Sequence, residues 1–176
     1  MGLTMPTDNI TFVCWVNVQG VKNQDLFSFE PLEIAGGRAT AHLPWDNGIH
    51  WQFGTPFTGI NPVAWDEDKY VDAWTHWAFT SSSDDGNLLV YEDGVEVRNV
   101  GGARELQNGA AAFQIGGRTG SSLEGWIDEF AIFSTVLSEA DIVRIMDQGL
   151  ARALAFEAVE PRGKAATTWA AIRTKK

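Results

Sequence analysis

The stretch Val90-Tyr91-Glu92-Asp93-Gly94-Val95-Glu96-Val97 decides the fold class of this chain of 176 residues. On both sides of Asp93-Gly94 the chain alternates in the way that is typical of strands that bury one face. Asp-Gly is a favoured pair for a two-residue type I′ turn, because both central residues of that turn adopt positive φ angles. The stretch therefore predicts a hairpin of two antiparallel strands.

Segments of the same kind recur along most of the chain. Residues 10–18 place alternating apolar side chains on one side of a predicted strand. Further strands are predicted at 26–29, 39–43, 49–53, 74–81, 88–92, 95–100, 112–116 and 126–133. Turn-forming residues such as Gly36-Gly37 and Asp46-Asn47-Gly48 separate them. Many short strands with almost no helix predict an all-β fold, an antiparallel sandwich or jelly roll rather than a parallel α/β sheet.

One short helix is predicted near residues 138–148. Ser138-Glu139-Ala140-Asp141 is typical of a capping box, and Gly149 stands where a left-handed C-terminal residue belongs. An apolar stripe at helical spacing is formed by Ile142, Ile145 and Met146. We expect this amphipathic helix to pack beside the sandwich.

The composition excludes several classes of protein. Hydrophobic residues make up 44% of the chain, which rules out disorder, and the length fits one domain spanning 1–176 with its core at 10–150. The net charge of −10 repels phosphates, so neither nucleic acid nor an anionic membrane surface is an expected partner. No apolar run reaches membrane-spanning length, which excludes insertion into a membrane. With Cys14 as the single cysteine, no intramolecular disulfide or thiolate zinc site is expected.

The two ends of the chain carry separate expectations. The opening residues lack the basic and apolar regions of a signal peptide, so none is expected within this chain. Near the other end, two segments flank Pro161-Arg-Gly-Lys164 and predict a C-terminal hairpin at 154–172. Ala-rich segments of this kind are also compatible with helix.

Four segments in a fixed order resemble one known family. They are Trp74-Thr-His-Trp-Ala-Phe-Thr80, Leu88-Leu-Val-Tyr-Glu-Asp-Gly94, Phe113-Gln-Ile-Gly-Gly117, and Gly125-Trp-Ile-Asp-Glu-Phe-Ala-Ile-Phe133 followed by Leu137-Ser-Glu-Ala-Asp-Ile142. Together they are similar to the LamG-like, concanavalin A-like jelly rolls of bacterial surface and secreted proteins. The resemblance covers residues 10–149 and implies a two-sheet antiparallel sandwich that recognises glycans or proteins, usually without catalysis.

The resemblance also implies a location and a metal. It predicts a protein of the cell surface or the extracellular space. Family members often hold a structural calcium ion with acidic residues on strands ahead of the position matching Ile10, and this chain lacks those strands. Two explanations stay open: the chain is a trimmed piece of a larger protein, or the hairpin at 154–172 replaces the missing strands.

Residues 44–51 carry the most interesting candidate for a ligand site. Sugars present apolar C–H faces and hydroxyl rims, and a tryptophan beside Asp and Asn supplies a flat platform with hydrogen-bonding groups. The candidate ligand-binding residues are Trp45, Asp46, Asn47, His50, Trp51 and Trp65. An alternative fits the pattern at least as well: Trp51 belongs to the core and Trp45 folds over the sheet edge. The other tryptophans lie in strand patterns that predict core packing: Trp15, Trp74, Trp77, Trp126 and Trp169.

Acidic residues at the last predicted strand raise the question of catalysis. A retaining glycosidase needs two carboxylates about 5 Å apart. Asp128 and Glu129 are adjacent and point to opposite faces of a strand, and Glu124 lies in a predicted turn, so no enzyme is expected. Asp128 shares its predicted face with Trp126 and Phe130, which makes it a partly buried carboxylate. Such a group needs a backbone amide, an arginine or a calcium ion as its partner.

Three functions follow, in order of preference. The first is a non-catalytic recognition or adhesion module, with a carbohydrate as the preferred ligand and a surface protein as the other. The second is a structural or self-assembling surface protein, a homo-oligomer in which a sheet edge of one copy pairs with the tail hairpin of another. The third is a glycoside hydrolase on the same scaffold.

Overall fold

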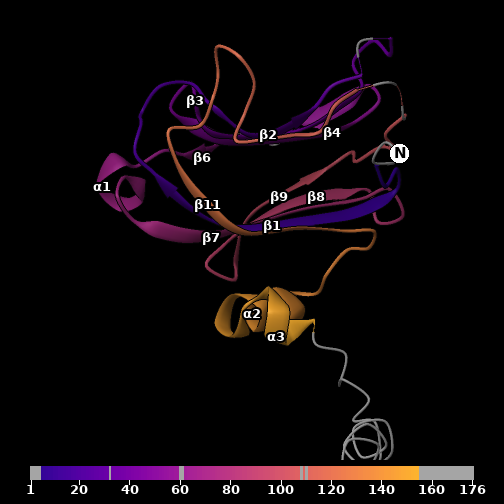
Figure 1. The fold of residues 1–176 in the computed structure, drawn as a ribbon. Coiled ribbons are helices and arrows are strands. Elements are labelled where there is room, and N and C mark those ends of the chain that lie inside the picture. The colour runs from indigo at the N-terminus through magenta and orange to yellow at the C-terminus, as the bar shows by residue number, and fades with distance from the viewer. Residues whose placement is uncertain (1–4, 32, 60–61, 108, 110, 155–176) are drawn as a thin grey trace, which may run out of the picture.

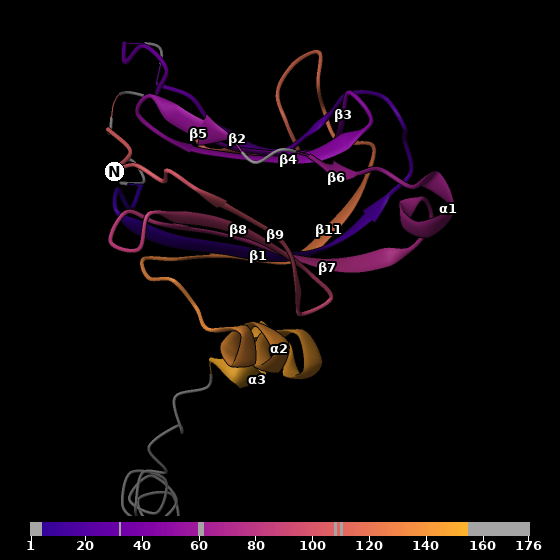
Figure 2. The same ribbon diagram turned by 180° about the vertical axis from the view of Figure 1, so that it is seen from behind.

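The computed structural model describes residues 5–31, 33–59, 62–107, 109 and 111–154. Two antiparallel sheets pack face to face (Figures 1 and 2). The first sheet contains β1 (Asn9–Val18), β7 (Trp74–Ser82), β8 (Asn87–Glu92), β9 (Val95–Gly101) and β11 (Gly125–Phe133). The second contains β2 (Asp25–Phe29), β3 (Arg38–Trp45), β4 (Gly48–Gly54), β5 (Phe57–Gly59), β6 (Val63–Ala64) and β10 (Gln114–Ile115). The predicted all-β jelly-roll sandwich is confirmed.

The strand order alternates between distant parts of the sequence. The first sheet runs β11-β1-β7-β8-β9, and the second runs β10-β2-β3-β4-β5, with β6 pairing with β4. Neighbouring strands such as β1 and β7 are therefore joined through the other sheet, as in a jelly roll. The sandwich therefore has two outer faces, one from each sheet.

The core lies between the inner faces of the two sheets. Alternate residues of β1 point inward, and Phe12 stacks on Phe27 of β2 with 4.3 Å between ring centroids. Trp51 is fully buried, and its indole N–H donates to the carbonyl of Thr80 on β7 at 2.8 Å. Cys14 is fully buried in the same core, and burial raises the pKa of its thiol.

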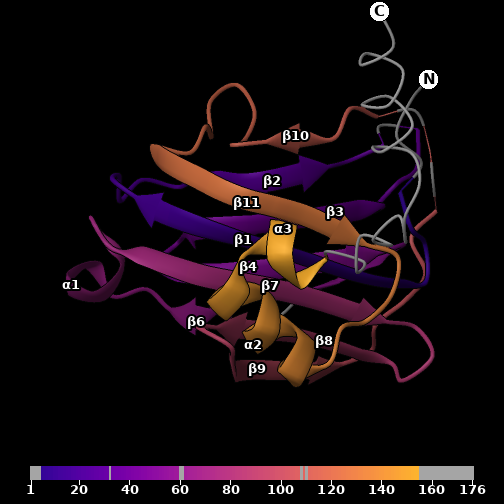
Figure 3. The same ribbon diagram turned by 60° about the horizontal axis from the view of Figure 1, so that its bottom comes forward.

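The predicted hairpin and helix both form, and they contact each other. Asp93 and Gly94 adopt φ angles of 47° and 81°, as a type I′ turn requires. Helix α2 (Glu139–Gln148) begins after Ser138, whose side chain accepts the backbone N–H of Asp141, and its C-cap Gly149 has a φ of 76°. The helix lies on the outer face of the first sheet (Figure 3), where Ile142 and Ile145 are buried.

Several elements differ from the sequence-based predictions. The strand predicted at 112–116 is reduced to β10, and two short helices were not predicted: α1 (Glu67–Tyr70) and α3 (Leu150–Ala153). The hairpin predicted at 154–172 lies outside the described residues, apart from Leu154. None of the helices in the described ranges combines the length and the apolar character that crossing a bilayer requires.

Candidate functional site

A pocket of about 410 Å³ opens on the outer face of the second sheet. It is lined by Arg38, His42, Trp45, Asp46, His50, Gln52 and Arg118. The β3–β4 hairpin supplies most of these side chains because residues alternate between faces along a strand. Since Trp51 points into the core, His50 and Gln52 point outward, and His42 lies directly opposite His50 in the strand register.

Trp45 stands at the end of this hairpin, beside a tight turn. Asp46 and Asn47 occupy the turn with φ angles of 46° and 60°, and both residue types tolerate this left-handed region. The half-buried indole of Trp45 lies 4.7 Å from the ring of His42, measured between centroids. Asn23 donates to the carboxylate of Asp46 at 3.0 Å and accepts its backbone N–H at 2.8 Å. The turn and its tryptophan are therefore held in place from two sides.

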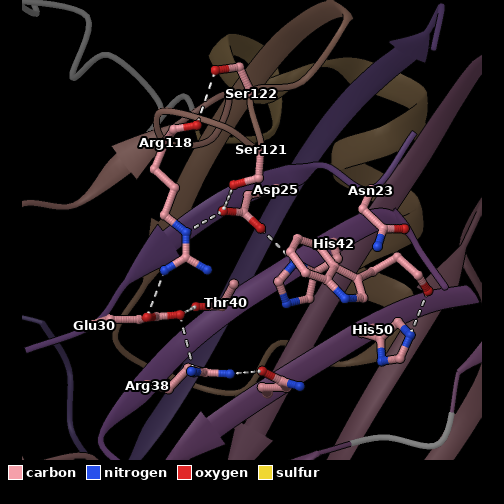
Figure 4. A network of polar contacts seen from close by, with 12 residues as sticks. Asn23, Asp25, Glu30, Arg38, Thr40, His42, His50, Arg118, Ser121 and Ser122 are labelled. Carbon is pink, nitrogen blue, oxygen red and sulfur yellow. Dashed lines mark hydrogen bonds and ion pairs between the residues drawn. The ribbon is translucent and has the colours of Figure 1, made fainter. Parts of the chain in front are cut away.

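Asp25 is the fully buried anion beneath the pocket (Figure 4). One of its oxygens accepts from His42 Nδ1 at 2.7 Å, and the other accepts from Ser121 Oγ at 2.7 Å and pairs with Arg118 Nε at 2.9 Å. Burial opposes ionisation, but the hydrogen bonds from His42 and Ser121 and the charges of His42 and Arg118 outweigh it. The pKa of Asp25 is consequently lowered from its ordinary value of 3.8.

Two arginines and two carboxylates continue this network across the sheet (Figure 4). Arg118 Nη1 pairs with Glu30 at 2.7 Å, and Glu30 in turn pairs with Arg38 Nε at 3.1 Å. Arg38 Nη1 donates to the side-chain oxygen of Gln52 at 2.8 Å. Each arginine charge is matched by a carboxylate, so the wall of the pocket carries fixed donors and acceptors with little net charge.

His50 is a neutral side chain whose Nδ1 can accept a hydrogen bond from a ligand. Its Nε2 lies 2.8 Å from the carbonyl of Trp45, so Nε2 carries the proton and Nδ1 is the acceptor in the neutral ring. Burial lowers the pKa of His50, and the neighbouring His42 lowers it further, against the opposing effects of the Trp45 carbonyl and Asp46. At neutral pH the pocket therefore keeps an uncharged imidazole here.

The structure brings together half of the predicted ligand-binding residues. Trp45, Asp46 and His50 line the pocket. Trp51 does not, because it is fully buried in the core, as the alternative interpretation held. Trp65 packs against Tyr70 at 5.0 Å between centroids and lies outside the pocket lining. Asn47 contributes the turn, where its carbonyl accepts the backbone N–H of Trp65.

Sequence reasoning missed the polar floor of this pocket. Its members are Asp25, Glu30, Arg38, His42, Gln52 and Arg118. Part of the signal was present, because a core position for Trp51 places Gln52 outward by strand alternation. The contribution of Arg118 could not be predicted from the sequence. Arg118 lies 93 residues after Asp25 in the chain, and only the folded structure brings its loop next to β2.

Asp128 and two tryptophans are more exposed than the sequence predicts. A β-bulge in β11 inserts one extra residue at Glu129, whose φ is 51°, so Phe130 faces the core while Asp128 stays on the outer face. Asp128 is thus exposed rather than partly buried. The core prediction was also wrong for Trp74 and Trp126, which are 49% and 57% exposed, whereas Trp77 is buried as predicted. Trp15 is half-buried on the outer face of the first sheet, and Trp169 lies outside the described residues.

The described ranges offer no ready-made site for a metal ion. No cluster of three or more His, Cys, Asp or Glu side chains suited to a metal ion occurs in them. The side chain of Asp128 accepts the backbone N–H of Glu129 at 2.8 Å. This amide is one of the partners that a carboxylate at this position was expected to find, and calcium at Asp128 stays a prediction.

Comparisons with known proteins bear on the fold and the family. Solved structures similar to this chain include the heptameric SAP-like pentraxin of Limulus polyphemus, at 13% identity and a TM-score of 0.57 over 80% of this chain and 70% of that one. The binding domain of botulinum neurotoxin DC, solved with rat synaptotagmin II, is similar at 17% identity and a TM-score of 0.59 over 80% of this chain and 36% of that one. A proposed carbohydrate-binding protein from Bacteroides ovatus is similar at 16% identity and a TM-score of 0.60 over 78% of this chain and 40% of that one.

The family is established by the sequence itself. No curated protein matches the chain, and the structural likenesses, at such low identity, show the fold alone. A family model for the concanavalin A-like lectin/glucanases superfamily, of laminin G type, matches residues 2–143. This match confirms the resemblance carried by the four ordered segments. Because the model spans most of the sequence, the chain belongs to the concanavalin A-like lectin/glucanase superfamily.

Proposed function

We propose that the chain is a non-catalytic carbohydrate-binding module, with the glycan seated in the pocket beside Trp45. The observation that carries the proposal is the meeting of a half-buried tryptophan with fixed hydrogen-bonding groups in one pocket on an outer sheet face. A pyranose ring places its C–H face on an indole while its hydroxyls exchange hydrogen bonds at the rim. Membership of a superfamily of lectins and glucanases supports a binding function in general.

The donors and acceptors around Trp45 favour an uncharged sugar. Arg38 and Arg118 already pair with Glu30 and Asp25, so an anionic ligand would compete with existing ion pairs instead of meeting free cations. The amide nitrogen of Gln52, the Nδ1 acceptor of His50 and the second carboxylate oxygen of Asp46 remain for hydroxyl groups, because Arg38 occupies the Gln52 oxygen and Asn23 the other Asp46 oxygen. We therefore expect neutral glycans to bind more tightly than sialylated or uronic-acid glycans.

The polar groups of this pocket favour binding over hydrolysis. Retaining glycosidases need two carboxylates about 5 Å apart, one of them a free nucleophile. The carboxylates of Asp25 and Glu30 are both committed to arginines, and Asp46 is held by Asn23. No sugar release is expected when the protein is incubated with a panel of polysaccharides.

A glycan array followed by calorimetry tests the proposal. Trp45→Ala should abolish binding of the best neutral glycan, or weaken it by at least tenfold, because the stacking platform is removed. Trp126→Ala is the matched control, since it removes an exposed indole from the other face of the sandwich and should leave the affinity within about twofold. Equal loss in both variants, or no loss in Trp45→Ala, would exclude this pocket as the glycan site.

Two additions to this experiment address calcium binding and the location of the protein. Running the array with calcium and with a chelator tests whether calcium affects glycan binding. If the ion is held by Asp128, the Asp128→Asn variant should bind glycans equally in both conditions. A role in adhesion at the cell surface, with a glycan or a surface protein as partner, is the setting in which this binding activity would be used. Surface labelling of intact producing cells checks the location directly.

A self-assembling surface protein is the second candidate. The observation that favours it is that β11, nine residues long, forms one edge of the first sheet. Such an edge offers backbone groups to a strand from another copy. Light scattering should then reveal oligomers that disappear when residues 155–176 are deleted, and a monodisperse monomer at high concentration would argue against it.

A further inference from the structure

A second pocket, of about 430 Å³, opens on the outer face of the first sheet, on the opposite side of the sandwich from Trp45. Trp15 and Trp74 provide its aromatic walls. Asp128, Glu129 and the last turn of α2, which includes Asp147, provide its polar walls. We define these residues as the acidic pocket.

The strand register explains why tryptophans and a carboxylate meet here. Trp15 on β1 lies opposite Asp128 on β11 and opposite His76 on β7. Two residues further along β1, Asn17 lies opposite both Trp126 and Trp74, on the same face of the sheet. Helix α2 covers the neighbouring part of this face (Figure 3). It ends at Gln148, and residues of its last turn line one side of the pocket.

Every charged group that lines the acidic pocket is negative. Asp128, Glu129 and Asp147 carry the charges, and none of the lining residues is basic. Asp128 accepts the backbone N–H of Glu129, and Glu129 accepts that of Leu150 at 3.2 Å, which orients both carboxylates without neutralising them. Across the described ranges, no Lys, Arg or His forms an ion pair with any of the three.

Two further features add to the negative potential. Helix α2 points its C-terminal end at the pocket and has no basic residue in its last turn, so no cationic side chain of the helix offsets the partial negative charge of that end. His76 lies behind Trp15, with 5.3 Å between ring centroids, and burial lowers its pKa to about 4. The imidazole is therefore neutral at pH 7 and places no positive charge beside the pocket.

We infer that the acidic pocket binds an organic cation, an alkylammonium group that lies against Trp74 and Trp15 and faces the carboxylates of Asp128, Glu129 and Asp147. The faces of tryptophan rings attract cations within about 6 Å, and quaternary ammonium groups are bound in this way by aromatic side chains. An alkylammonium group gains charge attraction from the three unpaired carboxylates, which a neutral sugar does not. This site is separate from the proposed glycan pocket, and neither inference depends on the other.

Tetramethylammonium chloride is the probe, followed by NMR of the indole N–H signals of the full chain. Titration should shift the Trp15 and Trp74 signals with saturation, while the Trp45 signal stays unchanged. The neutral compound tert-butanol, of similar size and shape, should bind at least fivefold more weakly. Trp74→Ala and Asp128→Asn should each weaken binding at least fivefold, and both side chains are exposed enough for the variants to fold.

Trp126→Ala is the matched control, because this exposed indole lies on the same face but outside the pocket lining. It should leave tetramethylammonium affinity within twofold. Equal binding of tert-butanol, equal loss in Trp126→Ala, or tighter binding of calcium or of a neutral xylan or glucan hexasaccharide at the same signals would each overturn the inference. Glycan binding lost in Trp45→Ala but kept in Trp74→Ala, with the reverse for the ammonium ion, would establish both sites separately.

Discussion

The two outer faces of the sandwich use charge in opposite ways. On the second sheet, carboxylates and arginines are paired through Asp25, Glu30, Arg38 and Arg118. On the first sheet, the carboxylates beside Trp74 lack cationic partners among the described residues. Paired buried charges hold a structure in place, whereas unpaired exposed charges add little stability and remain available to a ligand. One fold thus carries a rigid neutral face and an open negative face.

The largest expected effect comes from a pair of aspartate substitutions, one on each face. Asp25→Asn should lower the free energy of unfolding by about 3–5 kcal/mol at pH 7, because it breaks a buried ion pair and leaves Arg118 without one of its carboxylates. Asp128→Asn, at an exposed position, should change it by less than about 0.5 kcal/mol. Urea denaturation of both variants measures the difference.

The effect of Asp25 also has a defined pH dependence. Its folded-state pKa lies below the ordinary value of 3.8, so its stabilising contribution is present above that pH and is lost as pH falls through the folded value. The gap between the native chain and Asp25→Asn should therefore narrow below about pH 4. A gap that stays constant down to pH 2.5 would show that the ion pair is not its cause.

The second prediction concerns His76, which is buried beneath Trp15 on the outer face of the first sheet. Its pKa is lowered from 6.5 to about 4 by burial, against a smaller opposing effect of Asp93. Between these two values the unfolded chain binds a proton that the folded chain does not, so stability is lost as pH falls from 6.5 to 4. The loss should reach about 3 kcal/mol. Denaturation at pH 7, 5 and 4 measures it, and His76→Asn should remove this component of the decline.

A smaller effect is expected at the start of the helix that closes the acidic pocket. Ser138→Ala removes the hydroxyl that accepts the N–H of Asp141, and should lower the free energy of unfolding by about 1 kcal/mol. Because α2 forms one wall of the acidic pocket, tetramethylammonium affinity should fall, while glycan affinity at Trp45 stays the same. Parallel titrations of both probes distinguish this result from general destabilisation, which would weaken both.

The smallest expected effect is a difference between the two pockets in how ligand affinity depends on salt. Raising KCl from 20 to 200 mM shortens the screening length between exposed charges to below about 8 Å, so tetramethylammonium should bind roughly two- to threefold more weakly. Neutral glycan binding beside Trp45 should change less than twofold, because the charges there are already paired. Calorimetry at the two salt concentrations checks both, and an equal response would contradict the contrast between the faces.

The sequence was sufficient for the fold but only partly for the site. Strand alternation and turn chemistry are local, so the Asp93-Gly94 hairpin, the helix after Ser138 and the jelly-roll class could be predicted from the chain alone. The bulge at Glu129 could not, because it depends on how β11 pairs with β1, and it changed the environment of Asp128. By strand alternation Trp74 lies on the opposite face of β7 from the buried Trp77, and it stays exposed because helix α2 covers only a neighbouring part of that face.

The same limit applies to the pocket beside Trp45. Its tryptophan and turn are contiguous in sequence, and they were found. Its floor is assembled from β2, β3, β4 and the loop that carries Arg118, and only the strand order brings these together. For this reason, local sequence patterns could not predict that Asp25 and Arg118 form an ion pair.

The hydrogen bond from Trp51 to the Thr80 carbonyl has a consequence for how the sheets stay aligned. Apolar contacts between layers are non-directional, so they resist separation of the sheets but do little to prevent one from sliding over the other. A single directional bond across an interior of low polarity breaks that freedom, since any slide leaves a buried donor and a buried acceptor unsatisfied. The Trp51 hydrogen bond thus fixes the position of one sheet relative to the other, and with it the relative position of the two outer faces.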